Sequence, residues 1–121
     1  MQITKHTEGA MGERTGEALF QGSVWARTLA GAPESTDFTA AIVTFAAGAR
    51  TRMHQHSGDQ LLYIVHGVGQ VGTTDATHLV GAGDMVVIPA HEDHWHGAGD
   101  TGSPMGHLTV TRGDSQTTIS D

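Results

Sequence analysis

Short runs of alternating apolar residues, separated by glycine-rich turns, are the feature that most limits what this chain can fold into. The chain has 17 glycines among its 121 residues, and no long stretch repeats its apolar side chains with the period of a helix. Runs with a period of two, bounded by turn residues, are typical of β-strands. We therefore predict strands at residues 23–29, 38–45, 61–65, 85–88 and 106–111.

Turn signals separate these runs, including Gly-Ala-Pro at 31–33, Ser-Gly-Asp at 57–59 and two Gly-Ala-Gly-Asp segments at 81–84 and 97–100. Many short strands joined by such turns predict an all-β domain: a sandwich, a jelly roll or a small barrel. No repeat or linker divides the chain, so we expect one domain over residues 21–121. Residues 1–20 lack periodicity and are predicted to form an arm or irregular segment.

The charge balance excludes two classes of partner. Thirteen acidic residues against six basic ones give a net charge of −7, whereas nucleic acids and anionic membranes are bound by basic surfaces. We therefore expect neither nucleic acid nor membrane as a partner. The absence of cysteine removes disulfide and thiolate chemistry. The first residues contain no apolar segment typical of a secretory signal, so we expect a cytoplasmic protein.

The nine histidines outnumber the lysines and arginines together, and most of them are clustered. His54 and His56 are two residues apart, so on a strand their side chains project from one face and can bind one ion. Gln60 begins the next apolar run, where its amide oxygen can turn toward the same point. His94 follows the apolar run 85–88 and is the natural source of a third imidazole. These residues predict a metal site.

The spacing of these residues resembles that of a known family. Two strings carry the resemblance over residues 38–111, the first formed by Gly48, His54, His56, Gln60 and Gly67 and the second by Gly83, Pro89 and His94. They resemble the two conserved motifs of the cupin superfamily. The resemblance implies a double-stranded β-helix (jelly-roll) barrel, commonly dimeric, that binds a divalent transition metal through three histidines and a glutamate. The chain departs from this pattern with Gln60 for the glutamate, His91 for a glycine and Ala98 for an asparagine.

The chain is similar in more detail to small bacterial single-domain cupins. This group includes manganese-dependent hydroxynitrile lyases, and its relatives are often found beside carboxymuconolactone decarboxylases; the similar runs are 44–51, 60–65, 94–98 and 105–108. In those lyases three histidines and a glutamine bind the metal, which implies His54, His56, Gln60 and His94 as ligands here. The resemblance also implies an acid–base role for His107 and a substrate cavity shaped by Ala41 and Val43.

The residues themselves suit such chemistry. An amide ligand in place of a carboxylate leaves a bound divalent ion more positive, and hence a stronger Lewis acid toward an anion. We expect Mn(II), with Fe(II), Zn(II) or Ni(II) as alternatives. His107 shares one strand face with Thr111, and His96 follows His94 by two residues, so we expect both His96 and Thr111 at the substrate. We also expect His107 to exchange a proton near pH 7 without a large pKa shift.

These observations predict a metal-dependent lyase that cleaves or forms a C–C bond next to a carbonyl carbon. The expected substrate is a small carbonyl or cyanohydrin-type molecule, with His107 as the acid–base group. Two alternatives remain: an Fe(II)-dependent cupin dioxygenase, and a non-catalytic cupin that only binds metal or ligand. We further expect a homodimer or homotetramer that associates through the N-terminal arm and an edge strand, because pairing covers the exposed strand edge.

Overall fold

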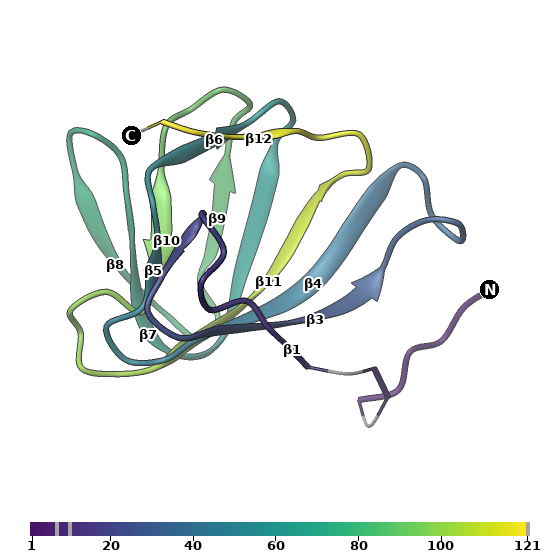
Figure 1. Cartoon of the computed structure of the whole chain (residues 1–121), viewed down its shortest axis with the longest axis horizontal. Coiled ribbons are helices and arrows are strands. Elements are labelled where there is room, and N and C mark those ends of the chain that lie inside the picture. Colours follow the sequence, from purple (N-terminus) through teal and green to yellow (C-terminus); the bar gives the residue numbers. More distant parts are fainter. Residues whose placement is uncertain (7, 10, 121) are drawn as a thin grey trace.

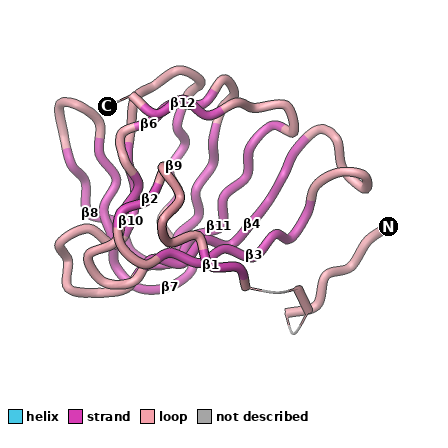
Figure 2. Tube along the Cα trace, viewed as in Figure 1, coloured by secondary structure: helices cyan, strands magenta, loops and turns pink. Residues whose placement is uncertain are grey.

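The computed structural model describes residues 1–6, 8–9 and 11–120, and all regular structure in these ranges is β-strand (Figures 1 and 2). The strands are β1 (Gly12–Glu13), β2 (Phe20–Gln21), β3 (Val24–Ala30), β4 (Phe38–Phe45), β5 (Arg50–Thr51), β6 (His54–His56), β7 (Gln60–Gly72), β8 (Thr77–Gly81), β9 (Met85–Ile88), β10 (Trp95–Gly97), β11 (Met105–Arg112) and β12 (Thr117–Ile119). Residues 7 and 10 of the expected arm and residue 121 of the expected domain lie outside the described residues. Within the described ranges, no helix has the length and apolar character needed to cross a membrane.

The strands form a curled antiparallel sheet in the order β1-β3-β4-β11-β7-β10-β5-β2, and β8 and β9 also pair with β7. Strand β7 connects the two halves, because its first part pairs with β11 and β9 and its last part pairs with β8 and β10. The halves curl toward each other as a jelly-roll half-barrel, and a ribbon of β6 and β12 crosses one end (Figure 1). This confirms the predicted all-β jelly-roll class.

The predicted strands 38–45 and 85–88 coincide with β4 and β9, whereas 61–65 is only the first part of β7. Gly67 interrupts the apolar pattern there and has a φ of 75°. A Cβ at Gly67 would overlap the carbonyl oxygen of Pro104, so only glycine fits where β7 passes between the two halves. The short strands β1 and β2 extend into the segment predicted to be irregular, where β1 pairs with β3 and β2 pairs with β5.

The apolar core fills the closed part of the half-barrel and borders a group of buried histidines. Phe45, Leu62, Ile64 and Met105 are fully buried. The ring of Phe45 lies 5.9 Å from that of His96 and 5.6 Å from that of His107, measured between centroids. The core therefore packs against two of the histidines that line an adjacent cavity. Because buried polar groups need hydrogen-bond partners or an ion, this cavity is the first place to look for a function.

Candidate metal centre

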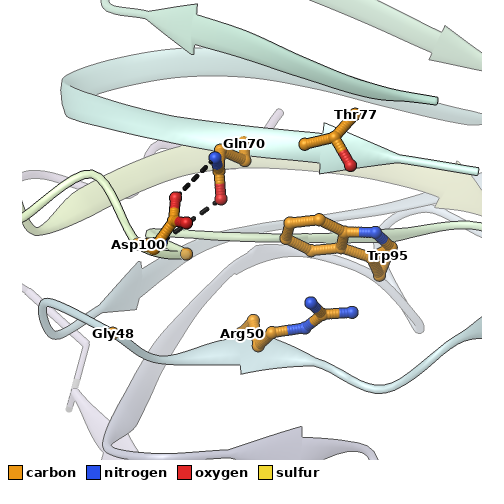
Figure 3. A pocket seen from close by; sticks show the side chains of 7 residues that line it. Gly48, Arg50, Gln70, Thr77, Trp95 and Asp100 are labelled. Atoms are coloured by element: carbon orange, nitrogen blue, oxygen red, sulfur yellow. Dashed lines mark hydrogen bonds between the residues drawn. The ribbon is translucent and has the colours of Figure 1, made fainter.

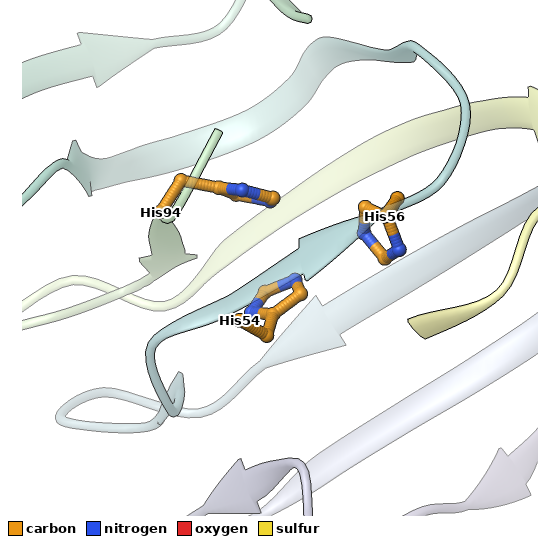
Figure 4. A group of neighbouring side chains, drawn as sticks. All are labelled: His54, His56 and His94. Atoms are coloured by element: carbon orange, nitrogen blue, oxygen red, sulfur yellow. The ribbon is translucent and has the colours of Figure 1, made fainter. Parts of the chain in front are cut away.

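Backbone pairing brings three histidines together. His54 and His56 lie on β6 with one residue between them, so their side chains point to the same side, as predicted (Figure 4). His94 lies directly opposite His54, because each backbone N–H donates to the carbonyl of the other at 2.9 Å. One candidate ligand atom from each of these three buried residues lies within 4.8 Å of the other two. The three histidines can therefore bind one ion.

In each of the three imidazole rings, the Nδ1 atom is held by a hydrogen bond. The Nδ1 atoms of His54 and His94 lie 2.8 Å from the carbonyl oxygens of Arg52 and Glu92, so both Nδ1 atoms carry the proton and donate. The Nδ1 of His56 lies 2.9 Å from the hydroxyl of Thr117 on β12. The Nε2 atoms of His54 and His94 are thus left with a free lone pair, and so is that of His56 when its Nδ1 donates to Thr117. Metal-binding histidines are held in this way, with the outer nitrogen fixed by a hydrogen bond.

Gln60 completes the group from the start of β7. Its Nε2 donates to the hydroxyl of Thr109 at 2.9 Å, which turns its Oε1 toward the histidines, 3.1 Å from Nε2 of His94. The Nδ1 of His94 already carries that ring's proton, so its Nε2 and the amide oxygen face each other as two lone pairs. A cation between them would remove this repulsion. The donor set, three imidazole nitrogens and one amide oxygen, thus fits a divalent metal.

Electrostatics keeps these rings uncharged and ready to coordinate. Burial lowers the pKa of His54 to about 4, and the neighbouring His94 and His56 add to the shift. Burial also lowers the pKa values of His56 and His94 below the usual value. Neutral imidazole is the form that binds a metal, so the site does not need to lose ring protons near neutral pH.

A second histidine pair lies next to this group. His96 on β10 and His107 on β11 approach from different parts of the curled sheet, and their Nδ1 and Nε2 atoms, respectively, are 3.0 Å apart. The backbone N–H of His96 donates to the hydroxyl of the fully buried Thr51 at 3.1 Å. Among the described residues, Nε2 of His96 and Nδ1 of His107 have no hydrogen-bond partner. The pair therefore has one free nitrogen at each end.

The expectation that His107 titrates near pH 7 is wrong. His107 is 0% exposed, and its burial lowers the pKa to about 4. Burial and the adjacent His107 also hold the pKa of His96 well below its usual value. Both rings are consequently neutral at physiological pH, and the pair shares a proton through a hydrogen bond instead of carrying a charge.

His54, His56 and Gln60 of the first group line one cavity of about 140 Å³ together with His96 and His107, whereas His94 is not part of its lining. A cavity of this size accommodates a molecule about as large as benzene. Besides the histidines and Gln60, an apolar rim surrounds it. The lining residues are Leu19, Phe20, Val43, His54, His56, Gln60, His96, His107 and Thr109.

The other residues predicted to lie at the substrate do not all line the cavity. Val43 lines the cavity and pairs in register with His107. Ala41 pairs with Thr109 and so shares the inner face, but it does not line the cavity. Thr111 lies further along β11, where its hydroxyl is 2.9 Å from that of Thr39.

Sequence reasoning missed several residues of the site. Leu19 and Phe20 were hidden in the segment predicted to be irregular, and their adjacent apolar side chains were the only signal. Thr109 carried a clearer signal, because it shares the strand face of His107. Thr117, which holds His56, could not be found from the sequence, since only the β6–β12 pairing brings it near.

Another hollow lies on the outer side of the same strands and is separate from this site (Figure 3). Trp95 lines this outer hollow, whereas its neighbour His96 lines the inner cavity. The guanidinium carbon of Arg50 lies 3.5 Å from the centroid of the Trp95 ring. Gln70 donates to Asp100 at 2.7 Å and ties β7 to the loop after β10. These contacts support the strand that positions His94 and His96.

Comparisons with known proteins agree with this geometry. The family described as "Cupin domain" matches residues 41–111. The (R)-mandelonitrile lyase of Granulicella tundricola is 37% identical over 95 residues, which cover 75% of this chain and 70% of that protein.

Solved structures share the fold. A cupin-like protein of Thermotoga maritima superposes with a TM-score of 0.81 and 26% identity, covering 92% of this chain and 87% of that one. The polyketide cyclase RemF of Streptomyces resistomycificus gives a TM-score of 0.88 at 19% identity, covering 100% of this chain and 86% of that one. At 19% identity, the similarity to RemF shows a shared fold alone.

Proposed function

The chain belongs to the cupin family, and from this membership and the geometry of its site we propose that it is a metal-dependent lyase of the hydroxynitrile-lyase type. The proposed substrate is a small cyanohydrin, or its aldehyde or ketone together with cyanide. The proposed metal is Mn(II), and the proposed compartment is the cytoplasm. The similarity to a mandelonitrile lyase and the glutamine in the donor set support the proposal.

The observation that carries the proposal is that one candidate ligand atom from each of three buried histidines lies within 4.8 Å of the other two, and that the amide oxygen of Gln60 lies 3.1 Å from Nε2 of His94. The Nε2 atoms of His54, His56 and His94 and the Oε1 of Gln60 would hold the metal. A divalent ion with four neutral ligands supplies Lewis acidity toward a developing anion, which suits a C–C cleavage that releases cyanide. The hydrogen bond from Gln60 to Thr109 keeps the amide oxygen turned toward the histidines.

The chain's own residues account for the proton. A neutral His96–His107 pair has two tautomers: either His107 Nε2–H donates to His96 Nδ1, or His96 Nδ1–H donates to His107 Nε2. Exchange between them turns one free end nitrogen from acceptor to donor and the other from donor to acceptor. His107 can thus accept the hydroxyl proton of a cyanohydrin, and the pair can return a proton to the departing cyanide. Because burial lowers the pKa of His107, it returns the proton readily.

The cavity explains why the substrate must be small. Phe20, Leu19 and Val43 supply an apolar rim, whereas the histidines and Gln60 supply all the polar lining except Thr109. A phenyl or short alkyl group fits the rim, and its reacting carbon then lies beside the polar lining.

The test is cyanide release from mandelonitrile by metal-loaded protein. We expect release in wild type and a drop of about 10²-fold or more in His107→Ala, in the range that general acid–base groups contribute. His78→Gln, which changes an exposed histidine on β8, is the matched control and should behave as wild type. Metal binding without cyanide release would overturn the lyase proposal. Fe(II)-dependent oxygen consumption would identify the dioxygenase alternative instead.

A further inference from the structure

Strand β6, which carries two of the candidate ligands, is held along its whole length by β12. Every residue of β6 pairs with a residue of β12, and the two strands form a sheet of their own, separate from the ten-stranded sheet (Figure 1). The pairing continues past both ends of β6. There the N–H of Ser57 donates to the carbonyl of Gln116, and the N–H of Ser120 donates to that of Met53, both at 2.9 Å. We call residues 116–120 the β12 strap.

The β12 strap also reaches the loop that carries the third candidate ligand. Asp93 immediately precedes His94, and one of its carboxylate oxygens accepts two hydrogen bonds. The amide of Gln55 on β6 donates to it at 3.1 Å, and the hydroxyl of Ser120 donates to the same oxygen. The strap, the strand with two ligands and the loop with the third are therefore joined at one carboxylate.

The hydroxyl of Thr117 is the contact that links the strap to a ligand ring. Residues directly opposite each other in an antiparallel pair share a face, so Thr117 lies on the side of His56, and Thr118 lies on the side of Gln55. The hydroxyl of Thr117 is 2.9 Å from Nδ1 of His56. Backbone carbonyls hold the same atom in the other two rings. His56 thus depends on the strap for its outer hydrogen bond.

The strap buries little apolar surface of its own. Thr117, Thr118 and Ser120 are exposed, and Ile119 is half-buried. Segments with few buried apolar contacts open locally at a low cost in free energy, and a two-stranded ribbon alone is only marginally stable. When the strap detaches from β6, the Nδ1 of His56 loses its partner and the ring is free to turn.

We propose that the β12 strap positions His56 through Thr117, and that docking of the strap on β6 and metal binding favour each other. The inference rests on the proposed function only for its metal centre. A metal at Nε2 requires the ring proton of His56 on Nδ1, where the docked Thr117 hydroxyl accepts it. Such coupling is reciprocal: a metal that binds the docked state more tightly stabilises docking by the same factor.

The first experiment separates the Thr117 hydroxyl from the strand that carries it. Thr117→Val removes the hydroxyl and keeps a β-branched side chain, whereas Thr117→Ser keeps the hydroxyl. Thr118→Val, the same change on the opposite face of β12, is the matched control. Titration with Mn(II) followed by electron paramagnetic resonance measures the affinity. We expect a loss of about 10-fold in Thr117→Val, wild-type affinity in Thr117→Ser and Thr118→Val, and the same circular dichroism spectrum in all four proteins.

The second experiment measures docking of the strap directly, by hydrogen exchange and mass spectrometry. Peptides that contain residues 116–120 should exchange about 10-fold more slowly in Mn(II)-loaded wild type than in metal-free wild type, because metal binding stabilises the docked state. The protecting effect of Mn(II) should be smaller in Thr117→Val. Peptides from β8, which pairs with β7 away from the strap, are the internal reference and should not change.

The outcomes separate this inference from the lyase proposal, since neither measurement uses catalysis. Wild-type affinity in Thr117→Val, or an equal loss in Thr118→Val, would overturn the role of Thr117. Exchange in residues 116–120 that does not respond to Mn(II) would overturn the coupling. A protein that shows the expected affinities and exchange but releases no cyanide would support the strap and overturn only the lyase proposal. A wild type that binds no metal would overturn the inference together with the metal centre.

Discussion

Gln60 shows how a single residue sets the character of the site. Its position along the chain was predictable, because it begins an apolar run four residues after His56. Its orientation was not, since that depends on Thr109 across the β7–β11 pair, which fixes the direction of the amide oxygen. Whether Gln60 is a ligand or only a polar neighbour of the metal thus depends on its hydrogen bond to a residue 49 positions away in the sequence.

Removing the partner of Gln60 should weaken metal binding without removing a ligand. In Thr109→Val the amide is free to rotate, and we expect the metal affinity to fall about 10-fold, in the range found for such supporting contacts. Thr39→Val, which breaks the hydroxyl contact with Thr111 instead, is the matched control. Calorimetric titration with Mn(II) measures both. Equal affinity in Thr109→Val and wild type would show that Gln60 is not held by this hydrogen bond.

At the scale of secondary structure, the local sequence pattern predicted some strands and missed others. Strands β4 and β9 follow directly from β-branched runs between turn residues. The second half of β7 was hidden by its glycines, and the five-residue strand β8 was not predicted. The His-x-His arrangement on β6 followed from strand alternation, but its pairing with His94 required the tertiary fold.

The loop between β9 and β10 retains the backbone of a family motif with a different residue. His91 stands where the cupin pattern has glycine, and its φ is 68°, in the left-handed region. Its N–H donates to the carbonyl of His56 at 2.8 Å, so the loop supports a candidate ligand. His91 thus keeps the backbone conformation and the hydrogen bond to His56, so the histidine in place of the motif's glycine does not alter the site.

Substitutions at His91 should follow backbone strain. Glycine relieves the left-handed strain, which costs a residue with a Cβ roughly 1–2 kcal/mol, whereas a β-branched residue increases it. We expect His91→Gly to raise the free energy of unfolding of the metal-free protein and His91→Val to lower it. Urea denaturation monitored by tryptophan fluorescence gives both values. The account of this loop fails if His91→Val is as stable as His91→Gly.

At the scale of the whole molecule, the curl of the sheet creates the cavity. His96 and His107 lie on strands that do not pair with each other, and they meet only because the two halves of the sheet curl together. Neither this contact nor the burial that lowers the pKa of His107 could be predicted from periodicity. The family resemblance implied an acid–base role for His107, and the structure shows that this residue is buried and contacts His96.

The buried histidines should make the metal-free molecule sensitive to acid. Burial lowers the pKa values of His54 and His107 to about 4 in the folded state, against about 6.5 when unfolded. Above pH 6.5 neither state is protonated and stability is constant. As the pH falls from 6.5 toward 4, the unfolded state gains protons first, so each residue costs about 1.4 kcal/mol of stability per pH unit. His56, His94 and His96 act in the same direction.

Urea denaturation of metal-free protein at pH 7.5 and pH 5.5 measures this effect. We expect a clear loss at pH 5.5, smaller in His107→Gln than in wild type because one titrating group is removed. Equal stability at the two pH values would mean that these histidines are hydrated in the folded state and that the cavity is more open than described.

The most direct test of the metal centre is elemental analysis of the purified protein, with wild type beside Gln60→Glu and His54→Ala. The account predicts about one manganese per chain in wild type, a shift toward iron in Gln60→Glu because a carboxylate replaces the neutral amide, and little metal in His54→Ala. Mostly iron in wild type would contradict the manganese lyase and favour the dioxygenase. No metal in wild type, even after incubation with Mn(II), Fe(II), Zn(II) and Ni(II), would contradict the metal centre itself.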